Sequence, residues 1–197
     1  MDEDLEKLHA SQTGVLYAAI GKFAVEFEMV CGSMRAVIMT ILAKEGLAND
    51  AVKEILLADQ TSEPLQSLVR SLAAETQALS EKDQKILAAI MNKVQRLTEA
   101  RNDVLHAIWI IGWFAFEKEG FAKVPGTRLK KNKKGVATQR PQFQADDFNA
   151  LTRQAEHLTS ALGQVMNAFA FNETLEEQLA LDSEGDITII PREPKRF

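Results

Sequence analysis

The chain has 197 residues, 46% hydrophobic and 26% charged, with a formal net charge of −5 at pH 7. This length fits one domain, or one domain with tails, and the apolar fraction is sufficient for a folded core, so disorder of the whole chain is excluded. A single cysteine, Cys31, excludes a disulfide framework and favours a reducing compartment. We interpret Cys31 as a small buried hydrophobe rather than a nucleophile.

Neither end of the sequence nor its apolar runs indicate a membrane protein. The chain begins with the acidic segment MDEDLEKLHA, unlike a secretory signal peptide. The longest apolar run, from Val104 to Phe116, is too short to cross a bilayer. We therefore expect a soluble, cytoplasmic protein without membrane association.

Positive charge is concentrated in one segment. Residues 117–140 contain eight Lys or Arg and two Glu, a net charge of +6, so the remainder of the chain carries −11. A local basic patch attracts a polyanion such as RNA within a Debye length of about 8–10 Å. The alternative interpretation is a solvated loop without a partner. The candidate RNA-binding side chains in this segment are Arg128, Lys130, Lys131, Lys133 and Lys134.

The first predicted element is a long helix. Apolar residues recur at alternating spacings of four and three from Leu16 to Ile41, which predicts one helix face packed against a neighbour. Hydroxyl side chains at 11–13 can cap its start, and Gly46 can end it.

Two shorter helices are predicted next. The first covers residues 49–58, with a cap at Asn49 or Asp50. Pro64 suits the first turn of the second, which we expect to be capped by Ser62.

A fourth helix is predicted to start at Ser80 and Asp83, which form a capping pattern. Arg101 falls on its apolar stripe. Because burying an unpaired charge costs several kcal/mol, Arg101 must pair with a carboxylate, face a cavity or bind an anion. The apolar residues of the stripe are Leu87, Ile90, Val94, Leu97, Val104 and Ile108.

The pattern changes after Gly112. Residues 113–124 alternate loosely around a Glu-Gly pair, which predicts a β-hairpin. Pro125-Gly126 indicates a turn, and residues 130–135 indicate a polar basic loop.

A last helix is predicted over 145–172, capped by Asp146 or Asp147. The remaining tail contains one apolar patch, 187–190, and is either disordered or docked as a strand.

Together these elements predict an all-α fold, an up-and-down bundle of four to five helices with a small β-hairpin insertion before the last helix. We expect a single helical domain over 1–177, with the hairpin and basic loop at about 113–143, and a C-terminal tail over 178–197.

The polar residues late in the fourth helix form the candidate site. Asn102 and His106 are four residues apart and share a helix face, and Arg101 lies about one hundred degrees round from Asn102. Trp109 lies on nearly the same face if the helix continues. A cation, an amide and an imidazole can together bind a phosphate and transfer a proton.

This order of residues, Arg-Asn followed by His106 and soon by Trp109, near the end of a helix and before a hairpin with basic residues and a closing helix, resembles the HEPN superfamily. The signature of that family is an arginine, four to six residues and a histidine. The resemblance covers roughly residues 11–172. Ala107 departs from the pattern, since glycine is commoner at that position in the family.

The resemblance implies metal-independent cleavage of RNA at the interface of a homodimer, without a cofactor. RNA carries its own nucleophile, the 2′-hydroxyl, so the enzyme supplies proton transfer and charge stabilisation. His106 would be the general acid or base, Arg101 would clamp the phosphate and Asn102 would orient the imidazole or hold the phosphate. Glu26 would anchor Arg101.

Asp103 and Trp109 are expected to support this site. The implied biological class is a toxin-type or phage-defence ribonuclease, with an antitoxin or a neighbouring defence protein as a candidate partner.

Two other interpretations stay open. HEPN-like domains without nuclease activity serve as dimerisation or nucleotide-binding modules, and Arg101 would then pair with Glu26, Glu28 or Glu99 as a structural charge. The third interpretation is an unrelated helical protein. A zinc site has little support, because the three histidines lack ligand spacing: His9, His106 and His157.

Overall fold

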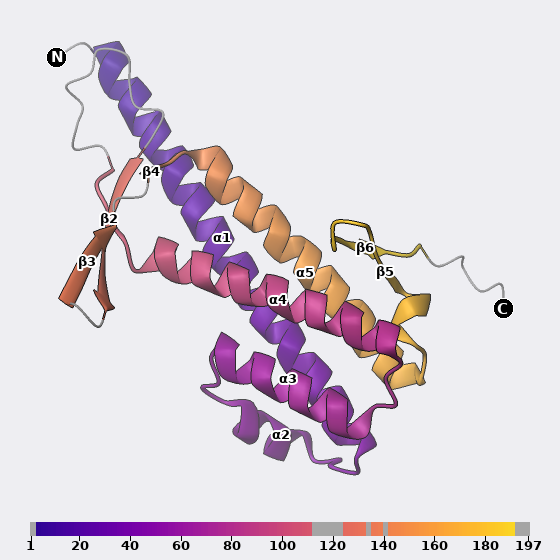
Figure 1. The fold of residues 1–197 in the computed structure, drawn as a ribbon. Helices are drawn as coiled ribbons and strands as arrows, with labels where there is room; N and C mark the ends of the chain where they lie inside the picture. Colours follow the sequence, from indigo (N-terminus) through magenta and orange to yellow (C-terminus); the bar gives the residue numbers. More distant parts are fainter. Residues whose placement is uncertain (1–2, 112–123, 133–134, 140–141, 192–197) are drawn as a thin grey trace. The chain divides into compact units, whose positions relative to one another are not determined.

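The computed structural model describes residues 3–111, 124–132, 135–139 and 142–191 (Figure 1). The chain divides into two compact units. The first unit comprises residues 1–27 and 99–154, and the second unit comprises residues 28–98 and 155–197.

The described part of the chain is mainly helical, with short antiparallel strands. Its helices are α1 (Glu3–Lys44), α2 (Asp50–Leu57), α3 (Ser62–Thr76), α4 (Glu81–Leu105), α5 (Ala145–Phe171) and the 3₁₀-helix η1 (Leu175–Glu177). Its strands are β1 (Ile108–Trp109), β2 (Val124–Asn132), β3 (Gly135–Gln139), β4 (Gln142–Phe143), β5 (Leu179–Leu181) and β6 (Ile187–Ile189). The prediction of a predominantly helical protein is thus confirmed, and short antiparallel strands lie before α5, although β2 and β3 are not the hairpin predicted over 113–124.

Helix α1 is longer than predicted, because it begins at Glu3 rather than near residues 11–13. Its first turn carries Glu3, Asp4 and Glu6, whose negative charges stabilise the positive end of the helix dipole. The predicted stop is confirmed: Gly46 has a φ of +93°, a conformation that suits glycine. The amide of Gly46 donates to the Ala43 carbonyl over 3.1 Å, which satisfies one of the open acceptors at the helix end.

The short helices begin close to their predicted starts. The Asn49 side chain accepts a hydrogen bond from the Val52 amide over 3.3 Å, so the predicted cap of α2 is confirmed. The cap predicted for α3 is wrong. Thr61 occupies the N-cap position, and Ser62 is the first helical residue. The Ser62 hydroxyl lies 2.7 Å from that of Thr98 in α4, because a buried hydroxyl needs a partner and the neighbouring helix provides one.

Asp83 joins two elements of the second unit. Its carboxylate accepts from the Ser80 amide over 3.2 Å, while the Ser80 hydroxyl accepts from the Asp83 amide over 3.1 Å, so the predicted capping pattern is confirmed. The other carboxylate oxygen accepts from the amides of Leu175 and Glu176, over 2.8 and 3.1 Å. Since Asp83 is only 2% exposed, these bonds fasten the start of α4 to η1 in a water-poor environment.

The C-terminal apolar patch forms a strand, the second of the two outcomes considered for it. Strand β6 pairs antiparallel with β5, and Leu179 and Ile187 are buried. Lys93 of α4 pairs with Asp186, and this hydrogen bond and charge lower the pKa of Asp186 below its ordinary value. A lowered carboxyl pKa means that the pair's contribution is present at neutral pH and is lost as pH falls through that lowered value.

The first unit contains the remaining strands. Strand β2 pairs antiparallel with β1, β3 and β4. The predicted turn at Pro125-Gly126 is wrong, because residues 124–132 form β2. The predicted loop at 130–135 is wrong at 130–132 and at Gly135, which belong to β2 and β3, while 133–134 lie outside the described residues. Apart from Val124, the hairpin predicted over 113–124 lies outside the described residues.

The predicted start of the last helix is close to the observed one. The Asp147 carboxylate accepts from the Gln144 amide over 2.8 Å, directly before α5 begins at Ala145. The predicted boundary between a helical domain over 1–177 and a tail stays a prediction.

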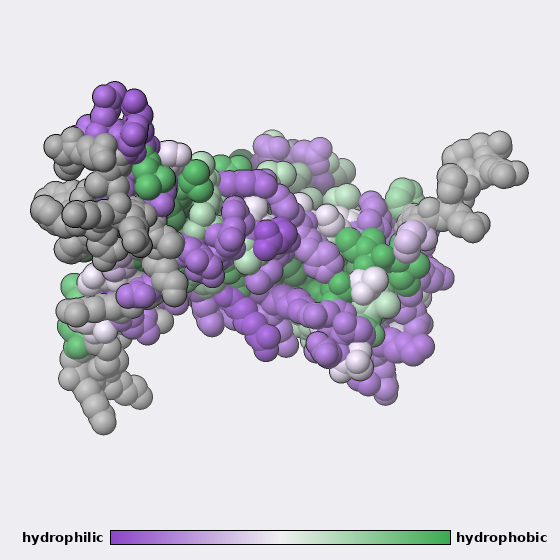
Figure 2. Space-filling view, turned by 90° about the horizontal axis from the view of Figure 1, so that it is seen from above, coloured by the Kyte–Doolittle hydropathy of each residue, from purple (hydrophilic) through white to green (hydrophobic). Residues whose placement is uncertain are grey.

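On the face shown in Figure 2, the described residues are mainly hydrophilic, with apolar patches among them. None of the helices that the structure describes contains a segment long and apolar enough to cross a membrane.

Replacement of Asp83 tests the junction between α4 and η1. Asp83→Ala leaves three backbone amides without their acceptor, so we expect the free energy of unfolding to fall by about 3 kcal/mol. The matched control is Glu81→Ala, an exposed residue of the same first turn, with an expected change within about 0.5 kcal/mol. Urea unfolding followed by circular dichroism measures both. Equal stability of the two variants would contradict the role of Asp83.

Candidate functional site

Arg101 lies near the C-terminal end of α4, in the first unit, and is half-buried. Its guanidinium carbon is 5.6 Å from the centroid of the Phe27 ring in α1, a cation–π contact. One guanidinium nitrogen, Nη1, donates to Oδ1 of Asn102 over 3.3 Å. Phe27 and Asn102 therefore fix the position of the arginine head on the helix surface.

The predicted proximity of α1 and α4 at this level is found, because Phe27 directly follows Glu26 in α1. Glu26 itself is half-buried. Its predicted role as an anchor for Arg101 stays a prediction.

Helix α4 ends at Leu105, so the prediction that it continues through Trp109 is wrong. The last helical bond runs from the His106 amide to the Asn102 carbonyl over 3.2 Å. The chain then enters β1, in which Ile108 pairs with Thr127 of β2. Ile108 is 67% exposed instead of lying on the buried stripe.

Trp109 supplies the physical reason for this early end. Its indole Nε1 donates to the Val104 carbonyl over 2.7 Å, a carbonyl that the helix end leaves without an amide partner. The ring meets Phe143 and Phe148 edge-on, with centroid distances of 5.5 Å to each. A Cβ atom at Gly126 would lie 2.8 Å from the indole ring. Trp109 therefore packs β1 against β2, β4 and α5, and its predicted role in supporting the catalytic residues stays a prediction.

This packing places His106 in the exposed turn between α4 and β1. His106 lies one helical turn after Asn102, since its backbone amide donates a hydrogen bond to the Asn102 carbonyl. His106 is exposed, and no hydrogen bond of its imidazole is found among the residues that the structure describes. An imidazole in such a position has the chemistry of a general acid or base.

Asp103 and Arg128 form an ion pair that joins α4 to β2. The Arg128 side chain is only 15% exposed, since it is used in this contact. The predicted catalytic residues Arg101, Asn102 and His106 are called the strip below. The ion pair with Asp103 brings one predicted RNA-binding residue, Arg128, next to the strip. Lys130 and Lys131 belong to β2 by their backbone, and two other predicted RNA-binding residues lie outside the described residues: Lys133 and Lys134.

Several residues that shape this region were not predicted from the sequence, because aromatic side chains and glycine do not by themselves indicate a catalytic or binding site. They are the aromatic residues around Arg101 and Trp109, together with the glycine that admits the indole. The run of β-branched and aromatic residues after Ala107 was the available signal, since such residues favour strands. The residues concerned are Phe27, Gly126, Phe143 and Phe148.

Within the described part of the chain, no group of three or more His, Cys, Asp or Glu side chains could hold a metal ion. Comparisons with protein-family models, with curated proteins and with solved structures find no match to this chain.

The contact between Gly126 and Trp109 can be tested by adding one methyl group. Gly126→Ala forces the indole away from Val104 and its aromatic neighbours, so we expect a loss of about 1–3 kcal/mol in the free energy of unfolding. Gly21→Ala is the control, since nothing lies within 4 Å of its added Cβ and alanine favours a helix interior by about 0.5–1 kcal/mol. Denaturant unfolding compares the two. Stabilisation by both substitutions would show that the indole is not confined.

Proposed function

We propose that this protein is a metal-independent endoribonuclease of the HEPN type, built on an up-and-down helical bundle and acting in the cytoplasm in a toxin or phage-defence setting. The observation that carries the proposal is the position of His106. Its exposed imidazole stands one helical turn beyond Asn102, whose amide oxygen is bonded to the fixed guanidinium of Arg101. We propose that His106 supplies the proton-transfer group and that Arg101, five residues earlier in the chain, supplies the cation that binds the phosphate.

In the proposed reaction, His106 takes the proton from a ribose 2′-hydroxyl, and the oxygen attacks the adjacent phosphorus. The bond from phosphorus to the 5′-oxygen breaks, and that oxygen receives a proton from an acid. The products are a 2′,3′-cyclic phosphate and a 5′-hydroxyl end. Arg101 and the amide nitrogen of Asn102 stabilise the additional negative charge on the phosphate oxygens.

The reaction needs a base and an acid, and each chain supplies one imidazole at this site. A homodimer with a twofold axis near the strip would supply His106 twice. The exposed apolar residues on both sides of His106 support such an interface. Leu105 is 36% exposed and Ile108 is 67% exposed, although both are apolar and in the same turn region.

The second candidate function is a non-catalytic HEPN-like module for dimerisation or for binding RNA or nucleotides. The observation that favours it is the structural use of the charges around the strip. Arg101 stacks on Phe27, and Asp103 pairs with Arg128. An antitoxin or a neighbouring defence protein is a candidate partner under either proposal.

The decisive activity test incubates purified protein with a mixed RNA pool in EDTA. We expect the wild type to produce cyclic-phosphate ends, and His106→Ala to reduce the rate by about 10²–10⁴-fold, the usual contribution of a general acid or base. His157→Ala is the matched control, since His157 is an exposed histidine of α5. It should cleave as the wild type does. Absence of cleavage by every protein, in monomer and dimer fractions alike, would favour the binding module.

A second variant separates phosphate binding from a structural charge at residue 101. Arg101→Met keeps an unbranched side chain over Phe27 but removes the charge. We expect binding of a 2′-O-methyl RNA, which cannot be cleaved, to weaken about tenfold or more, with little loss of stability. Arg96→Met, an exposed position of the same helix, is the control.

Fluorescence anisotropy and thermal unfolding measure both variants. Destabilisation of Arg101→Met by several kcal/mol with unchanged RNA binding would identify Arg101 as a structural charge instead.

A further inference from the structure

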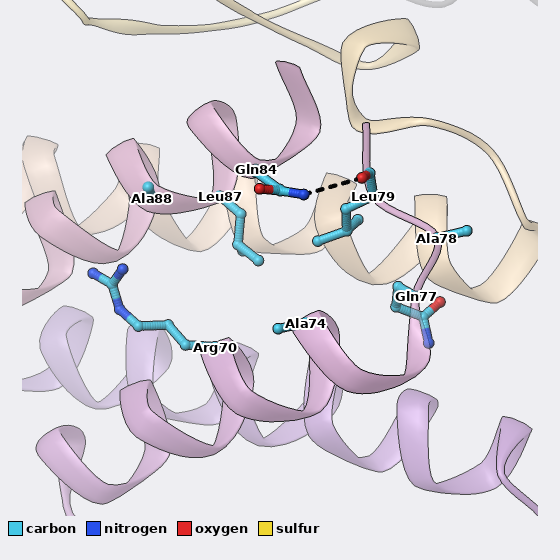
Figure 3. Close-up of a pocket in the computed structure, with 8 residues that line it drawn as sticks. All are labelled: Arg70, Ala74, Gln77, Ala78, Leu79, Gln84, Leu87 and Ala88. Carbon is cyan, nitrogen blue, oxygen red and sulfur yellow. Dashed lines mark hydrogen bonds between the residues drawn. The ribbon is translucent and has the colours of Figure 1, made fainter. Parts of the chain in front are cut away.

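A cavity of about 430 Å³ lies between α3 and α4 in the second unit (Figure 3). This volume is within the range of small-molecule sites, about 300–1,000 Å³. None of the residues proposed for RNA cleavage lines it. The cavity is therefore a separate feature of the protein.

Most of the cavity wall is apolar. Figure 3 shows Leu87 of α4 and Leu79 of the preceding connection extending into the space between the helices. Ala74 of α3 and Ala88 of α4 also line it, and their small side chains leave the space between the helices open. An unbranched hydrocarbon chain can lie against such a surface.

Arg70 is the one charged residue among those that line the cavity. Its Nη2 donates to Oδ1 of Asn92 over 2.9 Å, which orients the guanidinium. Asn92 is uncharged, so this bond leaves the positive charge of Arg70 available. Within the described part of the chain, Arg70 has no carboxylate partner. A guanidinium in this position matches a carboxylate or a phosphate, which accept paired hydrogen bonds.

The far end of the cavity is polar but neutral. Gln84 donates to the Leu79 carbonyl over 3.2 Å, as the dashed line in Figure 3 shows. Gln77 also lines this end, seven residues after Arg70 in the chain. Seven residues of helix correspond to a rise of about 10 Å, so the backbone positions of Arg70 and Gln77 lie about this far apart along α3.

We propose that this cavity binds a small anion with an unbranched apolar chain, its head on Arg70 and its chain over Leu79 and Leu87. The head is a carboxylate or a phosphate monoester, since both present the oxygen pair that a guanidinium recognises. This binding site does not depend on the ribonuclease proposal.

Isothermal titration calorimetry of the full chain tests the proposal with three probes of equal chain length: octanoate, octyl phosphate and octan-1-ol. We expect at least one of the two anions to bind with one-to-one stoichiometry, about tenfold or more tighter than the uncharged alcohol. The stronger of the two anions identifies the head group. Binding of neither anion, or equal binding of the alcohol, overturns the proposal.

Two variants locate the site. Arg70→Gln replaces the guanidinium with a neutral amide, so anion binding should weaken about tenfold, while Arg96→Gln should bind as the wild type does. Ala74→Leu, which adds bulk at the cavity wall, should weaken all three probes. Wild-type anion affinity in Arg70→Gln overturns the assignment.

Discussion

The hydrogen bond from the indole of Trp109 to the carbonyl of Val104 sets the geometry of the candidate site. A helix end leaves carbonyl groups open, and here a side chain from beyond the helix satisfies one of them. The indole can reach Val104 only if the chain leaves the helix after Leu105 and turns back. His106 occupies that turn and is exposed for this reason. The same ring packs against Phe143 and Phe148, so the turn is supported by residues from β4 and α5.

The charges beside this turn are held by neighbouring elements. Arg101 stacks on Phe27 of α1, and Asp103 pairs with Arg128 of β2. A fixed guanidinium loses less conformational entropy when it binds a phosphate than a free one does. The site proposed for RNA cleavage therefore combines a preorganised cation with an exposed proton-transfer group. Such a combination stabilises a charged transition state at little cost of reorganisation.

The sequence predicted the features that depend on local chemistry. The stop at Gly46, the cap at Asn49 and the capping pattern at Asp83 follow from residues within one turn of each helix end. The end of α4 depends on residues far along the chain, because Trp109 packs against Gly126 of β2. The apolar periodicity continues to Ile108, so it predicted a helix that extends beyond the observed end at Leu105. In the same way, the Ser62 hydroxyl can either cap α3 or bond to a neighbouring helix. The sequence does not decide between the two, because only the fold brings Thr98 within hydrogen-bond distance.

For the candidate site, the sequence identified Arg101, Asn102 and His106 as one strip, and the structure keeps Arg101 and Asn102 in contact with His106 one turn away. The most direct test of the central claim is an NMR titration of the full chain with a 2′-O-methyl RNA that cannot be cleaved. The claim predicts saturable shifts of the His106 imidazole and the Arg101 guanidinium resonances, at the same RNA concentration. If RNA shifts other resonances of the protein but not those of His106 and Arg101, RNA recognition at this strip, catalytic or not, is contradicted.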